Sequence, residues 1–246
     1  MDLTHFSLFT GIGGLDLAAE MAGFKTVGQC EYADYPTRVL EKHWPNVPRW
    51  RDIRDVTRES VNERIGGGIT VLSGGDPCQP HSTAGKRQGE LDARYLWPEM
   101  LRVIVELHPD WVVNENVPGS VSNGIAEKKI NDLESEGYIV QAFCIPACSV
   151  GAFHFRERVF TVAHINGKRV ERSSEEQILR QPYISGRQIS KSFQDAERRF
   201  DTFESRLCRS VHGLPHGVDR LKCLGNAVVP SHAFPIFRAI AEIERR

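Results

Sequence analysis

Short apolar runs alternate with amphipathic stretches over the first two thirds of the chain. Runs rich in β-branched and other apolar residues predict buried strands, and apolar residues spaced three or four apart predict helices. The strands are expected at residues 5–9, 26–30, 69–73, 110–114, 138–145 and 159–163. The helices are expected at residues 15–22, 35–43, 95–107, 125–135 and 231–245.

This alternation predicts an α/β fold in which helices flank a twisted, mostly parallel sheet, with strand 159–163 closing the sheet. After His164 the pattern stops, and residues 165–210 are rich in Ser, Gln, Glu and Arg without a helical or strand period. We interpret them as a loop-rich insert. The chain therefore divides into one domain, made of residues 1–164 and 221–246, and a small separate region at 165–220.

Composition narrows the class of protein. A chain of 246 residues can bury a sizeable core, and its net charge of −1 provides no overall basic field that would by itself indicate a nucleic-acid binder. The six cysteines lie far apart and no signal peptide precedes the first strand, so we expect a reducing cytoplasm. No apolar run approaches the ~20 residues of a membrane span.

Cys144 and Cys148 are the closest pair of cysteines in the chain. A zinc site would need a second pair at a similar spacing, and the sequence provides none. Two core cysteines are the preferred interpretation, and no metal is expected.

A cysteine within a turn rich in Gly and Pro follows the apolar run at 69–73. Pro77 and Pro80 fix φ on both sides of Cys78 and keep the thiol out of a helix. The loop follows a strand, and open α/β sheets place their sites at the carboxyl ends of strands. An isolated cysteine is more often a buried structural residue. Here the flanking prolines and glycines favour a reactive thiol.

The segment Phe-Thr-Gly-Ile-Gly-Gly at 9–14 joins the first strand to the first helix, where glycines expose backbone amides. Asp16 stands where a dinucleotide-binding loop has its third glycine, so a hydride-transfer enzyme is not indicated, and a plain tight turn stays open. Glu31 ends the second strand, where an acidic residue can bind ribose hydroxyls. Asp52 and Ile53 suit an adenine ring, although a surface Asp beside a core Ile explains them equally well.

A carboxyl and two guanidinium groups follow at further strand ends. Glu115 comes after an apolar strand, and beside a thiol loop it can keep a raised pKa and donate a proton. Simple pairing with a neighbouring arginine is the alternative. Arg156 and Arg158 can lower the pKa of a thiol and bind phosphate or a base oxygen, although such a charge run is often a solvated turn.

The order of these motifs along the chain is more specific than any one of them. In that order, the chain resembles the cytosine-5 DNA methyltransferase family, particularly its small phage and prophage members. The matching segments are residues 9–14, 77–80, 92–97, 115–117, 147–151, 156–158 and 225–230. The chain departs from the usual pattern at Asp76 and His81, where the family usually has Phe, and at residues 153–155 before the first arginine.

The resemblance implies a Rossmann-like, S-adenosylmethionine-dependent methyltransferase fold and a covalent mechanism. The Cys78 thiolate would add to carbon 6 of cytosine while Glu115 donates to ring nitrogen 3. Arg158 would hold the base carbonyl oxygen, and Arg156 would support the thiolate or a phosphate. The cofactor, S-adenosyl-L-methionine, would leave as S-adenosyl-L-homocysteine. Its expected site consists of Phe9, Gly11, Ile12, Gly13, Gly14, Glu31, Tyr32, Asp52, Ile53, Asp76, Pro77, Leu96, Asn226, Ala227 and Val228.

The resemblance also implies double-stranded DNA as the partner, with the target base flipped out of the helix. Family members carry a target-recognition domain between the arginine and Gly-Asn motifs, and here that region, 165–220, is unusually short. We expect it to leave the sheet at the catalytic edge, directly after Arg158. The candidate DNA-binding residues are Gln79, Ser82, Lys86, Arg94, Arg169, Arg172, Arg187 and Arg209.

The expected setting is restriction-modification or phage self-protection, with a cognate restriction endonuclease as a further partner, and the chain is expected to be a cytoplasmic monomer. Two other functions stay open. An RNA cytosine-5 methyltransferase is one, although the Cys-Phe-Thr signature of the tRNA-modifying branch does not occur in this sequence. A catalytically weak, partner-dependent DNA-binding protein is the other, suggested by the short insert; the presence of Cys78, Glu115 and Arg158 argues against it.

Overall fold

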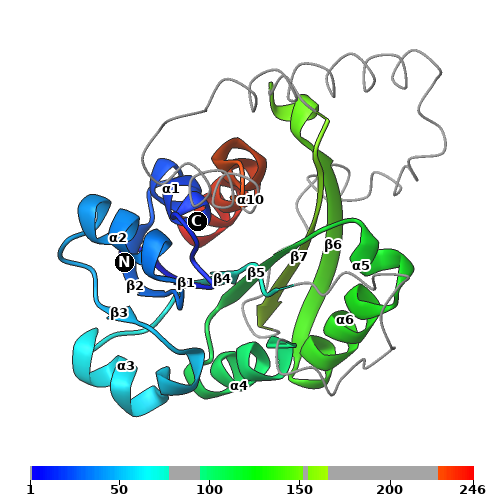
Figure 1. Cartoon of the computed structure of the whole chain (residues 1–246). Coiled ribbons are helices and arrows are strands. Elements are labelled where there is room, and N and C mark those ends of the chain that lie inside the picture. The colour runs from blue at the N-terminus through cyan, green and yellow to red at the C-terminus, as the bar shows by residue number, and fades with distance from the viewer. Residues whose placement is uncertain (1, 78–94, 152–154, 166–226) are drawn as a thin grey trace.

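A single seven-stranded sheet forms the centre of the molecule. The computed structural model describes residues 2–77, 95–151, 155–165 and 227–246. The strands are β1 (Thr4–Leu8), β2 (Lys25–Cys30), β3 (Arg49–Trp50), β4 (Val71–Gly74), β5 (Trp111–Asn116), β6 (Tyr138–Pro146) and β7 (Glu157–Ile165). They lie in the order β3-β2-β1-β4-β5-β7-β6 (Figure 1).

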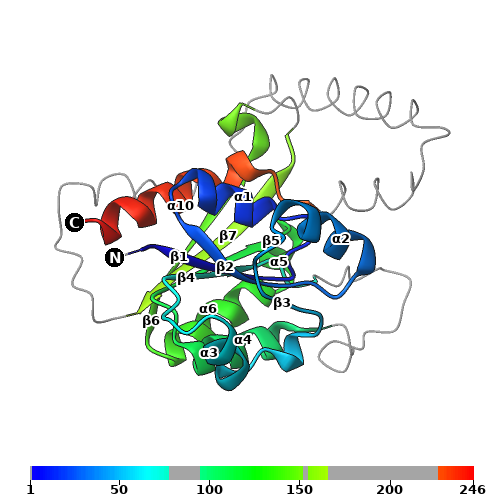
Figure 2. The same cartoon turned by 90° about the vertical axis from the view of Figure 1, so that its left-hand side faces the viewer.

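Helices cover both faces of this sheet. They are α1 (Gly14–Met21), α2 (Asp34–His43), α3 (Arg58–Arg64), α4 (Trp97–Leu107), α5 (Gly119–Ser122), α6 (Ile125–Ser135) and α10 (Pro230–Glu244), with the 3-10 turns η1 (Ile53–Asp55) and η3 (Ala147–Val150). Helices α1, α2 and α10 lie on one face, and α3, α4 and α6 lie on the other (Figure 2). The predicted α/β fold is confirmed.

The strand directions correct one expectation. Strands β3, β2, β1, β4 and β5 are parallel, whereas β7 is antiparallel to both of its neighbours, β5 and β6. The prediction that strand 159–163 closes the sheet is wrong, because β7 lies between β5 and β6 and β6 is the edge strand. Antiparallel neighbours need no helical crossover, so the short connection at 147–156 is enough to return the chain beside β5.

Several element boundaries differ from the sequence pattern. Strand β4 begins at Val71 and not at residue 69, and α4 begins at Trp97, with a proline in its first turn. Strand β3 and helix α3 were not predicted. Strand β3 has only two residues, too few to show a period. Helix α3 is short and is marked by a capping box between Thr57 and Ser60.

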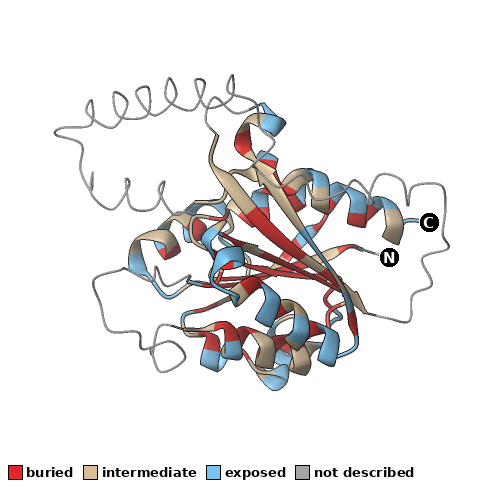
Figure 3. Cartoon of the chain, turned by 90° about the vertical axis from the view of Figure 1, so that its right-hand side faces the viewer, coloured by how far each residue is buried: buried red, intermediate tan, exposed pale blue. Residues whose placement is uncertain are grey.

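The core consists of two apolar clusters, one on each face of the sheet. Alternate residues of a strand point to opposite faces, so Leu72 and Val112 pack with α4, while Val71 and Val113 pack with α1 and α10. Figure 3 shows the buried residues concentrated in the sheet and on the inner sides of the helices. The parallel strands therefore pack between two helical layers, which position the carboxyl edge of the sheet.

Candidate active site

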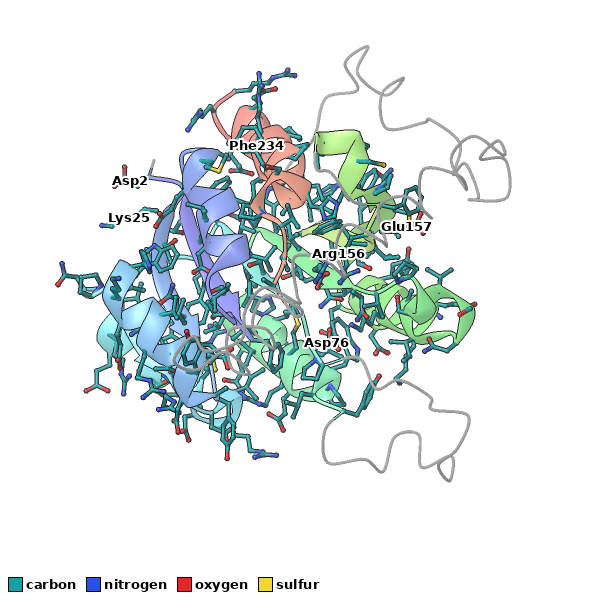
Figure 4. All side chains as sticks on the ribbon, turned by 45° about the horizontal axis from the view of Figure 1, so that its top comes forward. Asp2, Lys25, Asp76, Arg156, Glu157 and Phe234 are labelled. Carbon is teal, nitrogen blue, oxygen red and sulfur yellow. The ribbon has the colours of Figure 1, made fainter. Side chains whose placement is uncertain are left out.

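The sequence-predicted site residues gather at one edge of the sheet. The carboxyl ends of β1, β2, β4 and β5 meet there because these strands are parallel. Strand β7 runs the opposite way, so its amino end reaches the same edge, with Val159 opposite Asn116. In Figure 4, Asp76 and Arg156 lie towards the middle of the molecule, away from Asp2 and Lys25 at the start of β1 and β2.

Glu115 and Arg158 form an ion pair at this edge. Glu115 Oε1 lies 2.7 Å from Arg158 Nε, and the two side chains are only 12% and 14% exposed, respectively. Burial raises the pKa of Glu115, and the nearby charges of Arg158 and Arg156 oppose that rise. The alternative interpretation of Glu115, pairing with a neighbouring arginine, is therefore confirmed. The raised pKa agrees with a proton donor, and that role stays a prediction.

Arg156 connects the arginine motif to the last described segment of the chain. Its Nη2 donates a hydrogen bond of 2.8 Å to the backbone oxygen of Ala227. Two motifs that are far apart in the sequence therefore meet beside Glu115, as their shared assignment to one site predicts.

The glycine-rich loop lies between β1 and α1 and is held by Glu31. The backbone amide of Gly11 donates to Glu31 Oε2 at 2.7 Å, and that of Ala33 donates to Oε1 at 2.8 Å. Phe9 takes a positive φ of 52°, which is uncommon for a residue with a side chain and marks a sharp turn at the strand end. Glu31 thus shapes the loop, and its expected contact with a ribose stays a prediction.

The structure also brings Val228 to this loop. A Cβ on Gly14 would clash with the backbone oxygen of Val228, so only glycine permits this approach. By contrast, a Cβ on Gly11 would meet none of the described atoms within 4 Å. The loop is therefore closely packed at Gly14 and open at Gly11, where a ligand can approach the backbone.

Asp52 and Ile53 lie at the end of β3. Ile53 is buried in the core, and Asp52 accepts a hydrogen bond of 2.9 Å from the backbone amide of Arg54 and pairs with its side chain. This geometry agrees with the plainer interpretation of a core Ile beside a capping Asp. A role for either residue in binding adenine stays a prediction.

The remaining described candidates have clear positions. Gly13 is buried and precedes α1, Tyr32 is exposed after β2, and Leu96 precedes α4. Ile12 is partly buried within the glycine-rich loop, and Pro77 is exposed after β4. The candidates outside the described residues are Cys78, Gln79, Ser82, Lys86, Arg94, Arg169, Arg172, Arg187, Arg209 and Asn226.

Asp76, which departs from the usual family residue, is buried and bonded. Its carboxylate accepts hydrogen bonds from Lys129 on α6 and from Asn114 on β5. Neither partner was among the predicted site residues. A signal was present in the sequence, because Lys129 interrupts the apolar stripe that Ala126 and Leu133 form on α6.

Asp16 occupies the first turn of α1 and is fully buried. Its Oδ1 accepts hydrogen bonds of 2.9 Å from Ser7 and from Gln29. Among the described residues, its Oδ2 has no hydrogen-bond partner. Burial raises the pKa of Asp16 to about 6, and the two hydrogen bonds act against that rise. The residue that replaces the third glycine is thus a buried carboxyl beneath the loop.

The exit point of the insert corrects another expectation. Strand β7 has nine residues and runs from Glu157, beside Arg158, to Ile165. Ile165 pairs with Tyr138 at the opposite end of the strands. The prediction that the insert leaves at the catalytic edge, directly after Arg158, is therefore wrong. A strand of this length carries the chain about 26 Å across the sheet. The chain returns to the catalytic edge at Ala227.

Neither a metal-binding cluster nor a membrane-spanning helix occurs in the part of the chain that the structure describes. No group of three or more His, Cys, Asp and Glu side chains suited to a metal ion occurs among these residues. None of the described helices is long and apolar enough to cross a membrane. Cys144 and Cys148 are both free thiols.

Comparison with known proteins decides the family. A family model described as C-5 cytosine-specific DNA methylase matches residues 3–207, which is most of the chain. The chain belongs to this family. The prediction made from the order of its motifs is confirmed.

Two curated relatives align with this chain over different shares of their own length. It is 35% identical to the type II methyltransferase M.FnuDI of Fusobacterium nucleatum over 160 residues, covering 63% of this chain and 45% of that protein. It is also 35% identical to the type II methyltransferase M.AquIA of Picosynechococcus over 184 residues, covering 68% of this chain and 74% of that protein. The chain thus spans less than half of the first relative.

Solved structures agree with this assignment. A prophage-encoded protein of E. coli, described as a DNA modification methyltransferase, is 27% identical with a TM-score of 0.58, covering 67% of this chain and 47% of that chain. Spodoptera frugiperda DNMT2 has the same TM-score at 21% identity, covering 68% and 51% of the two chains, and this likeness shows the shared fold alone.

Proposed function

We propose that this chain is a DNA cytosine-5 methyltransferase that transfers a methyl group from S-adenosylmethionine to a flipped-out cytosine in duplex DNA. The observation that carries the proposal is the meeting of Glu115 and Arg158 at the sheet edge to which the strand before Cys78 also leads. Family membership supports DNA as the substrate. Relatives named as type II methyltransferases support a restriction-modification setting.

The residues at the glycine-rich loop fit the cofactor. The open side of Gly11 admits a ligand to the backbone, and the nearby Glu31 carboxylate can accept hydrogen bonds from ribose hydroxyls. We assign the ribose to Glu31, the adenine to Asp52 and Ile53, and the amino-acid end to Asn226 and Ala227. When bound, S-adenosylmethionine supplies an electrophilic methyl group on a sulfonium sulfur.

The residues of the chain must first make carbon 5 of cytosine nucleophilic. The Cys78 thiolate forms a bond to carbon 6, and Glu115 donates its proton to nitrogen 3, which receives the electrons displaced from the ring. The raised pKa of Glu115 favours the protonated form that this step uses. After methylation, a base removes the hydrogen from carbon 5, the bond between carbon 6 and sulfur breaks so that the thiolate is restored, and nitrogen 3 returns its proton to Glu115.

The two arginines hold the charges around this chemistry. Arg158 lies against the Glu115 carboxylate, so a base whose nitrogen 3 faces Glu115 presents its carbonyl oxygen towards the same guanidinium. Arg156 is fixed by the backbone oxygen of Ala227 and supports the thiolate or a phosphate of the flipped nucleotide. Neither role requires a metal ion.

We assign DNA recognition to residues 165–220, with the residues after Cys78 contributing contacts near the flipped base. Arginine and lysine side chains in both segments suit phosphate contacts, and a few can read base edges. Strand β7 ends at Ile165, at the end of the sheet opposite to Glu115 and Arg158, so the insert follows the strand at a distance from the proposed reacting base.

The deciding experiment is methyl transfer from tritiated S-adenosylmethionine to duplex DNA and, separately, to tRNA by the purified chain. Incorporation into duplex DNA supports the proposal. Incorporation into tRNA alone would replace it with the RNA methyltransferase. DNA binding without incorporation into either would make the chain a partner-dependent binding protein.

A further inference from the structure

A buried ion pair lies at the end of β4, directly before the thiol loop. The side chains of Lys129 and Asp76 are only 1% and 2% exposed. The Lys129 ammonium donates to Asp76 and, at 2.9 Å, to Asn114 Oδ1, and it lies 5.0 Å from the centre of the Trp97 ring. Two hydrogen bonds and an aromatic face thus accommodate its three protons.

This network connects three elements around the site. Lys129 comes from α6, Asn114 from β5 and Asp76 from the segment after β4. Asn114 Nδ2 donates to Asp76 Oδ1 at 2.8 Å and to the backbone oxygen of Gly74 at 3.1 Å. The start of the thiol loop is therefore tied to the residue that immediately precedes Glu115 in the chain.

The same segment forms one wall of the Glu115 site. A Cβ on Gly75 would lie 3.0 Å from Glu115 Oε2, so the loop backbone passes close to the carboxylate. The negative charge of Asp76 also acts on Glu115 and contributes to raising its pKa. A shift of Asp76 would therefore move the wall beside Glu115 and the approach to Cys78, which is two residues further along the sequence.

Stability alone does not account for this pair. Replacing a buried ion pair with apolar residues of similar size is often neutral or stabilising, whereas removing one partner is costly. The pair restricts the position of the backbone, because Asp76 can accept hydrogen bonds from Lys129 and Asn114 together only when the backbone of residues 74–76 keeps its observed conformation.

We propose that Lys129 is a positioning residue for methyl transfer, acting through Asp76 to fix the backbone before Cys78 relative to Glu115. Lys129 touches no reacting atom. The inference rests on the proposed function, because it assigns a task to a residue that supports that same site.

The test compares Lys129→Met with Lys128→Met. Lys128 is the adjacent residue of the same type on α6, but its side chain is 45% exposed. Circular dichroism first establishes the temperature range in which each variant is folded. We then measure kcat, the Kd for S-adenosylmethionine, the rate of covalent trapping by duplex DNA containing 5-fluorocytosine, and the rate at which iodoacetamide modifies Cys78, read by peptide mass spectrometry.

In folded Lys129→Met, kcat and the trapping rate should fall on the order of tenfold or more, as for a reacting group displaced by a fraction of an ångström to an ångström. The cofactor Kd should change less than kcat does, because the variant leaves the glycine-rich loop untouched and acts on the predicted cofactor site only at Asp76 and Pro77. Lys128→Met should match wild type in every measurement. A folded Lys129→Met protein that traps DNA at the wild-type rate would overturn the proposal.

The double variant Asp76→Asn/Lys129→Met separates positioning from folding. It leaves no buried charge without a partner, so its thermal stability should recover while kcat stays low. If stability and kcat recover together, or if this variant cannot fold, the pair serves the fold and the proposal fails. If the wild-type chain traps no DNA, the proposed function fails instead. The rate at which iodoacetamide modifies Cys78 then tests the positioning role by itself. A rate changed in Lys129→Met but not in Lys128→Met supports that role, and equal rates in all three proteins overturn it.

Discussion

Arg156 and Ala227 are 71 residues apart in the chain, yet Arg156 Nη2 donates a hydrogen bond of 2.8 Å to the backbone oxygen of Ala227. This bond joins the segment before the insert to the segment after it, at the catalytic edge. The approach of Val228 to Gly14 fixes the returning segment a second time. The described segments on either side of the insert are therefore held together by contacts of their own, so we expect the insert to be alterable without unfolding the sheet.

Deleting residues 170–200 should abolish sequence-selective DNA binding and leave S-adenosylmethionine binding intact. About 25 residues of the insert would remain, enough to span the roughly 26 Å length of β7. Fluorescence anisotropy with DNA duplexes and calorimetry with the cofactor measure the two effects. Methylation of the same sites at the same rate by the deletion protein would show that recognition lies elsewhere.

Binding of DNA by the whole chain should also weaken steeply with salt, because a short module depends on phosphate contacts.

Cys78→Ser should abolish turnover while cofactor affinity stays unchanged. Serine is close to cysteine in size, but its hydroxyl does not form a comparable anion at neutral pH. Duplex DNA carrying 5-fluorocytosine should trap the wild-type chain as a covalent adduct, visible as a mobility shift on a denaturing gel, and should not trap the variant.

Cys148→Ser serves as the matched control for Cys78→Ser, because Cys148 is a free, partly buried thiol on η3 and is not among the predicted site residues. It should be trapped like wild type. Near-normal methylation by Cys78→Ser would exclude the covalent mechanism.

Glu31→Ala and Asp52→Ala should weaken S-adenosylmethionine binding more than they slow transfer at saturating cofactor. Each removes polar contacts, on the order of 1–3 kcal/mol, that a bound nucleoside would use. Glu31→Ala should have the larger effect, because this carboxylate also holds the backbone amides of Gly11 and Ala33. Calorimetry measures both, with exposed Glu41→Ala as the control. An unchanged Kd in both variants would remove these residues from the cofactor site.

Asp16→Asn should stabilise the chain at neutral and alkaline pH. Burial raises the pKa of Asp16 from 3.8 to about 6, so its contribution to stability is complete below pH 3.8 and is lost as the pH rises through about 6. The gap of about two pKa units corresponds to about 3 kcal/mol. Asparagine cannot ionise, yet its Oδ1 can still accept the hydrogen bonds of Ser7 and Gln29.

Urea unfolding at about pH 4.5 and about pH 8, without cofactor, measures this difference in the free energy of unfolding. The gain from Asp16→Asn should appear at the higher pH and shrink at the lower one. The exposed Asp55→Asn should show no such gain. Equal stability of Asp16→Asn and wild type at both pH values would contradict the assignment of a raised pKa to Asp16.

The sequence predicted those parts of the fold that repeat a period over many residues. Helix α6 matches its predicted range of 125–135 because apolar residues recur along it with helical spacing. The two residues of β3 carry no period, and the place of β7 inside the sheet depends on pairing between distant strands. Local patterns contain no information on such pairing.

The candidate site divides in the same way. The meeting of Glu115 and Arg158 was predicted because both lie in short motifs at strand ends, and strand ends meet at one edge of a sheet. Lys129 was missed because its importance comes from burial against Asp76, 53 residues earlier in the chain. The exit of the insert was mispredicted because the length of β7, and so the edge at which it ends, depends on its pairing with β6.

The position of α10 bears on how the chain is synthesised. Ala233, Phe237 and Ile240 of this helix pack against α1 and against β-strand residues from the first half of the chain. Until residues 230–244 leave the ribosome, one face of the sheet lacks this covering and exposes apolar side chains to water. A chain that lacks α10 should therefore bind chaperones, and α10 supplied as a separate peptide should bind that chain.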